Sequence, residues 1–304
     1  MAHADNARSP HPFFSPHTSS PMAWTGSLDL HYKLDPHHAA GSTSRTFCLD
    51  RHVGPLRVLA SLYPDGPAVC HKVLVHPPGG IVGGDELAIT LRVDAGAHGL
   101  VATPGATRFY RTAGEAALQS VDAQVAEGAR LEWLPLETIA YPGTLAENRM
   151  RFRLAPTAEM IGWDVIALGL PASGQPFESG RYSQHLELPG CWIERGTIAA
   201  EDHRLLDSPL GLDGQRVFGT LWIARGDALD AAMREGLLED ARDAAAASLL
   251  ATRCGSTSPS PSLVVVRAIA PRTEQLNALF ISIWSRWRER AWGVKGEPLR
   301  VWRT

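Results

Sequence analysis

Alternation of apolar and polar residues with a period of two dominates this chain from about Leu28 to Ile223. In segment 87–93, four aliphatic residues alternate with Ala, Thr and Arg, and segments 121–125 and 150–154 alternate in the same way. A period of two places successive side chains on opposite faces of a strand, so each segment is expected to bury one face. Gly, Pro and Asp turn signals separate about a dozen such strands.

Many short strands at near-regular spacing are typical of a β-sandwich, a barrel or a solenoid. Gly (28) and Pro (22) are abundant among the 304 residues, which fits a chain with many turns. The length alone favours two domains, but no linker interrupts the strand pattern. We therefore predict a disordered tail at 1–23, rich in Pro, His and Ser, followed by a single domain at 24–304.

The period changes after Ile223. Asp227 is the expected N-cap of a helix that continues to about Thr252, and Thr273 is the expected cap of a second helix. Between them, 256–262 is predicted to be a loop and 263–269 a buried strand. The second helix carries one apolar stripe at helical spacing, which favours core packing over a partner-binding role. The predicted fold class is mainly β, with two helices near the C-terminus.

Charge and composition limit the classes of partner. With 29 basic and 32 acidic residues the net charge is −3, so a nucleic-acid partner is not expected. No apolar run approaches the roughly 18–20 residues that span a bilayer, and the N-terminus lacks the apolar core of a signal peptide. The four cysteines are widely separated, which favours reduced thiols and a cytoplasmic location.

The sequence HPPGGIVGGD at 76–85 is the most unusual segment. Its glycine spacing is that of a phosphate-binding loop, but Asp85 and Glu86 stand where such a loop needs Lys and Ser or Thr. Two carboxylates repel a phosphate and attract a cation. The segment is therefore predicted to be a stiff turn that presents carboxylates, the alternative being an ordinary solvated β-turn.

Three further segments combine turn signals with charged residues: TPGATRFYR at 103–111, LEWLPLETI at 131–139, and the apolar stretch 161–174 around Asp164. A carboxylate within an apolar run needs a partner or a function. No nucleophile elbow and no zinc-protease motif occurs. Cys70, His71 and His76 do not converge easily on one strand, which argues against a metal cluster there.

Together these segments resemble the urease accessory protein family UreD, also called UreH. The resemblance is carried by 76–85, 103–111, 131–139 and 162–174, by ER at 194–195, GTL at 219–221 and LRVWRT at 299–304, and runs from about Leu28 to Thr304. The region 287–297 departs from the ending common in the family.

This resemblance implies a β-helix-like stack of short strands with two helices near the C-terminus. It also implies a non-catalytic maturation factor that bridges apo-urease and the accessory protein UreF, which recruits the GTPase UreG. Such a complex delivers nickel to the urease active site, and the nickel travels through a passage inside the UreD-type protein. No permanently bound cofactor is expected, only transient nickel(II).

Carboxylates hold a divalent cation weakly enough to release it, as a conduit requires. We therefore hypothesise that Asp85 and Asp164 line the passage. The weaker candidates for the metal path are Glu86, Glu137, Glu178 and Glu194, and the second-line candidates for the passage lining are Thr107, Arg108, Tyr110 and Arg111.

A second hypothesis places the docking surface for UreF on the C-terminal helices, because Trp and Arg are favoured in binding hot spots. Its residues are Trp284, Arg286, Trp287, Arg288, Arg290 and Trp292. Two other classes stay open. One is a carbohydrate-active enzyme that uses paired carboxylates on a β-helix scaffold, and the other is a scaffold that binds partners without touching metal.

Overall fold

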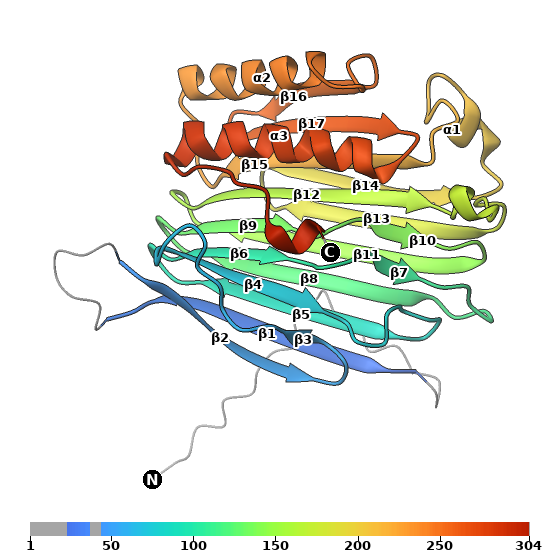
Figure 1. Cartoon of the computed structure of the whole chain (residues 1–304), viewed down its shortest axis with the longest axis horizontal. Coiled ribbons are helices and arrows are strands. Elements are labelled where there is room, and N and C mark those ends of the chain that lie inside the picture. Colours follow the sequence, from blue (N-terminus) through green and yellow to red (C-terminus); the bar gives the residue numbers. More distant parts are fainter. Residues whose placement is uncertain (1–22, 37–43, 304) are drawn as a thin grey trace, which may run out of the picture.

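Two stacked β-sheets and a layer of helices make up the protein, for which the computed structural model describes residues 23–36 and 44–303 (Figure 1). The predicted tail at 1–23 therefore lies, except for Ala23, outside the described residues. That residues 24–304 form one domain stays a prediction. Within the described part, no helix combines the length and apolar character needed to cross a membrane.

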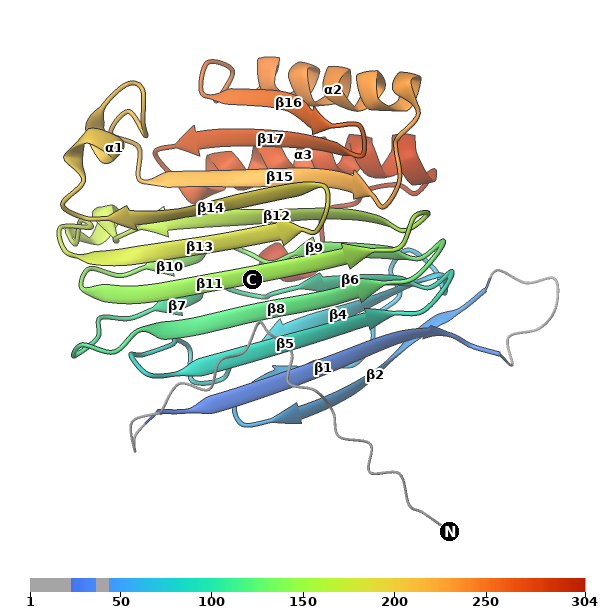
Figure 2. The same cartoon turned by 180° about the vertical axis from the view of Figure 1, so that it is seen from behind.

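The first sheet forms one face of the molecule and is seen from its outer side in Figure 2. It has seven strands. In spatial order they are β14 (Trp192–Ala199), β13 (Gly180–Leu188), β11 (Thr144–Leu154), β8 (Ala117–Val125), β5 (Glu86–Val93), β1 (Thr25–Leu34) and β2 (Thr46–Val53).

The second sheet lies between the first sheet and the helices. Its order is β16 (Cys254–Ser260), β17 (Leu263–Ala270), β15 (Val217–Arg225), β12 (Glu159–Leu168), β9 (Arg130–Leu134), β6 (His98–Ala102), β4 (Val69–Val75) and β3 (Arg57–Val58). The short strands β7 (Thr107–Phe109) and β10 (Thr138–Ala140) pair with each other, and β10 also pairs with β12.

The chain winds as a coil that alternates between the two sheets. After β5 in the first sheet it enters β6 in the second, returns through β8, and repeats the step with β9, β11, β12 and β13. Successive coils stack with parallel strands, so β5, β8, β11 and β13 are parallel neighbours, as are β4, β6, β9 and β12. The predicted fold class, a mainly β stack with two helices near the C-terminus, is confirmed.

The proline- and glycine-rich motifs interrupt the second sheet at one level of the stack. The chain leaves β4 at Val75 and rejoins the sheet at Ile81, which bridges to Phe109 of β7. Segment 103–106 separates β6 from β7, and 135–137 separates β9 from β10. In three consecutive coils the strand of the second sheet is thus interrupted, because Pro lacks a backbone N–H donor and Pro and Gly both disfavour regular strand geometry.

Two helices cover the outer face of the second sheet, namely α2 (Ala231–Ala246) and α3 (Thr273–Trp292). One apolar core lies between the sheets, and another lies between the second sheet and these helices. The stripe of α3 is buried in the second core, so the expectation of core packing is confirmed. Its members are Leu276, Leu279, Phe280, Ile283, Trp284 and Trp287.

Some local predictions were wrong. Asp230, not Asp227, caps α2, because its carboxylate accepts the backbone N–H groups of Ala232 and Met233. Thr273 is the first residue of α3 rather than its cap. The predicted loop 256–262 is largely the edge strand β16, which tolerates proline because one side of an edge strand needs no partner. The short helix α1 (His203–Asp207) was not predicted.

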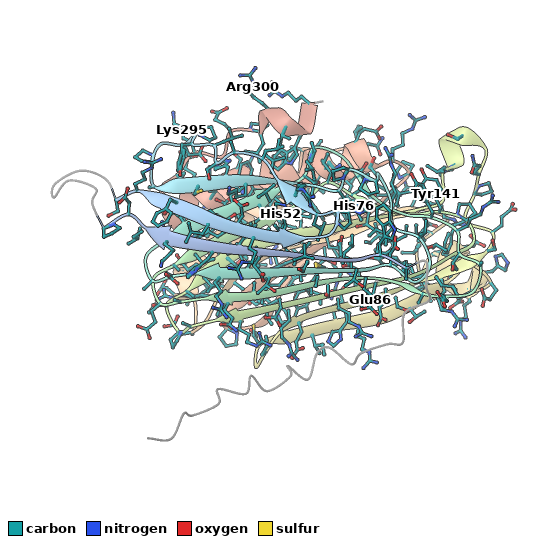
Figure 3. All side chains as sticks on the ribbon, turned by 90° about the horizontal axis from the view of Figure 1, so that it is seen from below. His52, His76, Glu86, Tyr141, Lys295 and Arg300 are labelled. Carbon is teal, nitrogen blue, oxygen red and sulfur yellow. The ribbon has the colours of Figure 1, made fainter. Side chains whose placement is uncertain are left out.

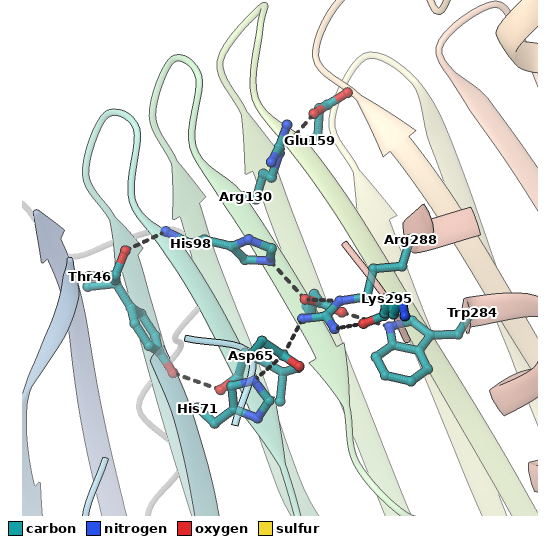
Figure 4. A network of polar contacts seen from close by, with 12 residues as sticks. Thr46, Asp65, His71, His98, Arg130, Glu159, Trp284, Arg288 and Lys295 are labelled. Atoms are coloured by element: carbon teal, nitrogen blue, oxygen red, sulfur yellow. Dashed lines mark hydrogen bonds and ion pairs between the residues drawn. The ribbon is translucent and has the colours of Figure 1, made fainter. Parts of the chain in front are cut away.

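A buried ionic network fixes α3 to the second sheet (Figure 4). Arg288, which is 0% exposed, donates from Nε to Glu132 Oε1 at 3.1 Å and from Nη2 to Asp65 Oδ2 at 2.6 Å. An imidazole pairs with each carboxylate: His98 with Glu132 at 2.8 Å and His71 with Asp65 at 2.8 Å. The network therefore ties α3 to β4, β6, β9 and the loop around Asp65.

Hydrogen bonds complete the network. Trp284 donates its indole N–H to Glu132 Oε2 at 2.6 Å, and Arg288 donates to the carbonyl of Lys295 at 2.6 Å. Although burial acts to raise it, the hydrogen bond from His98 and the charge of Arg288 lower the pKa of Glu132. Burial lowers the pKa of His98 against the pull of Glu132. Because both groups have a lower pKa in the folded state, both make the folded protein more stable at neutral pH, and this stability is lost as the pH falls.

We expect Arg288→Met to lower the free energy of unfolding by about 3–5 kcal/mol at pH 7, because it leaves the buried carboxylate of Glu132 and the partly buried one of Asp65 without their cation. The measurement is urea denaturation. Arg286→Met is the matched control, since Arg286 lies on the same helix with an exposed side chain; its expected effect is within about 0.5 kcal/mol. Equal stability of the two variants would contradict the structural role of the network.

Candidate functional site

A row of polar side chains runs through the otherwise apolar space between the two sheets. On the first sheet, Gln119 of β8 lies in register with Asn148 of β11, which lies in register with Gln184 of β13. Gln119 is 9% exposed and Asn148 1% exposed, and the amide of Gln119 donates to Asn148 Oδ1 at 3.5 Å. These three amides form a ladder across parallel strands, on the face that otherwise buries aliphatic side chains.

The second sheet supplies the facing half of the row. Asp164 of β12 lies in register with Thr220 of β15, which lies in register with Arg267 of β17. Gln184 joins the two sheets by donating from Nε2 to Asp164 Oδ2 at 2.5 Å. Glu194 of β14 accepts from Thr220 at 3.2 Å and pairs with Arg267 at 2.6 Å.

Asp164 is the predicted site residue with the most perturbed chemistry. It is 4% exposed, and burial together with the charge of Glu194 raises its pKa to about 7, against the effect of the Gln184 hydrogen bond. Near neutral pH it can therefore exchange a proton for another cation at little cost. Glu194, a weaker candidate in the sequence, is the carboxylate brought close to it.

A hollow of about 230 Å³ opens at one end of the row. It lies where the stacked motifs interrupt the second sheet, and its lining includes His76, Thr103, Thr107 and Arg108 together with Gln119 from the row. Burial lowers the pKa of His76, in opposition to the charge of Asp85. Figure 3 labels this histidine among the side chains of the molecule. Two of the predicted passage-lining residues, Thr107 and Arg108, thus border this hollow.

The other end of the row approaches the edge strand β14 at Gly196. Gly196 is in register with Gln184 and lies two residues from Glu194 on the same strand. A side chain at this position would therefore point to the inner face. Among the residues that the structure describes, no atom lies within 4 Å of where a Cβ atom at Gly196 would stand. The inter-sheet row therefore ends beside unoccupied space at the sheet edge.

Asp85 has a structural role in this protein. Its two carboxylate oxygens accept the backbone N–H groups of Trp24 at 2.9 Å and Val82 at 3.0 Å. It thereby closes the glycine-rich turn and fastens the start of β1 to it. Glu86, the next residue, begins β5 with its side chain on the outer face, since Leu87 points into the core.

The remaining predicted carboxylates lie away from the row. Glu137 accepts a hydrogen bond from Asn277 of α3 at 3.2 Å, which places it on the helical side of the second sheet. Glu178 is exposed in the loop before β13. Tyr110 packs edge-on against Tyr141 with ring centroids 4.8 Å apart, and Arg111 is exposed beside Gly143. The structure does not bring these four residues together with Asp164.

The proposed docking residues of α3 divide into buried and exposed sets. Trp284, Trp287 and Arg288 are 0% exposed and Trp292 is 8% exposed, so the folded helix does not present them to a partner. Arg286 and Arg290 are exposed, and Arg290 pairs with Asp240 of α2. The tryptophans and Arg288 instead serve the core and the ionic network.

Sequence reasoning missed the three amides and Gly196. A signal for the amides was available, because Gln119 and Asn148 continue the buried parity of the alternating segments 121–125 and 150–154. An uncharged polar residue at a core position of a strand is unusual enough to mark a site. Nothing in the sequence distinguishes Gly196 from the many turn glycines.

Within the described residues, no group of three or more His, Cys, Asp or Glu side chains is arranged to hold a metal ion. The row instead offers amide, hydroxyl and carboxylate oxygens in sequence. Such hard, sparse donors bind a divalent cation weakly and permit its release. These features define the class of protein: a β-solenoid-like stack with a polar row through its interior.

Comparison with known proteins identifies the family. Residues 25–303 match the model described as UreD urease accessory protein, and the chain belongs to this family. It is 55% identical over 283 residues to the urease accessory protein UreD of Leptothrix cholodnii, covering 93% of this chain and 100% of that one. The corresponding protein of Methylibium petroleiphilum is 53% identical over 296 residues, with the same coverage. That of Variovorax paradoxus is 51% identical over 283 residues, again with 93% and 100% covered.

We expect Asp164→Asn to stabilise the protein at pH 8 by on the order of 2 kcal/mol, and to have little effect at pH 4. The raised pKa means that the folded state keeps a proton that the unfolded state releases above about pH 4. Wild-type stability therefore falls relative to the variant as the pH rises from about 4 to 7. Urea denaturation at both pH values tests this, and a pH-independent difference would contradict it.

Proposed function

We propose that this protein is a urease maturation factor that guides nickel(II) through the polar row between its sheets towards apo-urease. Family membership supports the maturation role, because the relatives are named urease accessory proteins. The inter-sheet row supports the passage, and the observation that carries the proposal is the chain of side chains from Gln119 to Glu194 through Asp164.

The two ends of the row are the proposed entry and exit of the passage. The hollow beside His76 and Thr103 is the proposed port on one side, and the space at Gly196 is the proposed port on the other. Between them a cation meets amide oxygens first and then two carboxylates. Asp164 binds the cation when it loses its proton and releases the cation when the proton returns.

Weak binding suits transport better than tight binding. A closed Cys or His cage holds a transition metal for long times, whereas single carboxylates with amide and water oxygens release it. Nickel is therefore the cargo of the protein and not its resident cofactor. The ion pair between Glu194 and Arg267 adds a competing cation close to the Gly196 port.

The proposed partners are apo-urease, UreF and, through UreF, the GTPase UreG. Of the residues considered for UreF docking, Arg286 and Arg290 are the exposed ones and remain in the proposal. The cytoplasm is the proposed compartment, because all four cysteines are free thiols. In this scheme the protein positions a metal ion and catalyses no reaction itself.

Reconstitution tests the maturation role. Apo-urease, UreF, UreG, GTP, bicarbonate and nickel are mixed with and without this protein, and ureolysis is measured. We expect activation to depend on the protein, because it alone connects the nickel source to the urease active site in this scheme. Equal activation without the protein would reject the proposed function.

A plug at Gly196 tests the passage separately. We expect Gly196→Trp to reduce urease activation by about tenfold or more, since the indole would occupy the space beside Gln184 and Glu194. Ile193→Trp is the matched control, because Ile193 lies in the same edge strand with an exposed side chain on the outer face of the sheet. Co-purification with UreF and urease should be unchanged in both variants. Full activation by a normally assembled Gly196→Trp complex would remove this port from the path.

A further inference from the structure

A cationic row crosses the outer face of the first sheet, on the side opposite to the polar row in its interior. Arg149 of β11 is in register with His185 of β13, and His185 is in register with Arg195 of β14. Strand parity places all three side chains outward, because Asn148 and Glu194 next to them point inward. Two guanidinium groups thus flank one imidazole across three neighbouring strands.

Like charges placed directly opposite one another on a sheet are destabilising unless a counter-ion relieves them. Arg149 pairs with Glu147 at 2.8 Å, and Glu187 lies 3.7 Å from His185. Arg195 is exposed and forms no ion pair within the part of the chain that the structure describes. Burial lowers the pKa of His185, and the charges of Arg195, Arg151 and Arg149 add to this effect against that of Glu187. The local field is therefore positive although the whole chain carries −3.

The surface is hollowed at this row. A hollow of about 580 Å³ is lined by Arg149, His185 and Arg195, by Glu147, by the hydroxyls of Ser183 and Thr197, and by Gln184 and Gly196 between them. These hydroxyls lie 2.9 Å apart and form the next pair on the same face of β13 and β14, two positions along from His185 and Arg195. Guanidinium forks and hydroxyl donors on one face are the groups that bind planar or tetrahedral oxyanions.

We propose that this hollow is an oxyanion-binding site, which accepts either a small free oxyanion or a carboxylate presented by a protein. Arg195 supplies the uncompensated charge, Arg149 a second guanidinium, and Ser183 and Thr197 hydroxyl donors. His185 lies between the two arginines, so a bound anion favours its protonated form and protonation in turn strengthens binding. The proposal does not rest on nickel transport, because the side chains that would bind the anion point outward; Gln184 and Gly196 of the interior row border the same hollow but supply none of these donors.

Isothermal titration of the full chain with sulfate, whose charge is constant between pH 5.5 and 8, tests the free-ion source. A tetraglutamate peptide tests the protein-carboxylate source. We expect saturable binding of at least one probe, tighter at pH 5.5 than at pH 8. Arg195→Gln should weaken it by about tenfold, the effect of losing one charge-assisted hydrogen bond. Arg92→Gln should leave it unchanged, since Arg92 is an exposed arginine on the same sheet face but four strands away.

His185→Gln separates the site from general charge attraction. We expect this variant to retain binding at pH 8 and to lose the strengthening at pH 5.5. Binding of sulfate alone assigns a free oxyanion, and binding of the peptide alone assigns a protein carboxylate. The proposal is overturned if neither probe binds, or if Arg195→Gln and Arg92→Gln weaken binding equally.

Discussion

The in-register stacking of parallel strands is the constraint on which the rest of this structure depends. Because β5, β8, β11 and β13 are parallel and unshifted, equivalent positions of successive coils meet as straight rows. The same geometry therefore produces the apolar core, the interior row of amides and the alignment of Arg149 with His185 on the outer face. The antiparallel edge strand β14 adds Arg195 to that outer row. A shift of one residue would turn each row to the opposite face.

The interior row is costly for a core and so requires compensation. Amides and carboxylates buried between sheets lose their hydrogen bonds to water, which costs free energy unless protein groups replace those bonds. Gln184 and Thr220 provide partial compensation through hydrogen bonds to Asp164 and Glu194. The raised pKa of Asp164 reflects a desolvation cost that these hydrogen bonds do not fully offset.

The helical layer solves a different problem. The second sheet is apolar on both faces, and α2 and α3 cover the face that would otherwise be exposed. Arg288 sets the position of α3 through the buried carboxylate of Glu132 and the partly buried one of Asp65, a geometry that specifies one docking orientation. The same burial explains why Trp284 and Trp287, which resemble hot-spot residues in the sequence, contribute to folding here.

The sequence by itself determined the strand pattern, the turn motifs, the C-terminal helices and the family, because these depend on local periodicity and on residue identity. It also singled out Asp164 as a carboxylate in an apolar segment. Only the tertiary structure decided which carboxylates share a space. Asp85 closes a turn and Glu137 faces α3, while Glu194 comes to Asp164 from another sheet. The register between strands that are distant in sequence decides which carboxylates meet. That register is set by the packing of whole coils, so it cannot be read from any single segment.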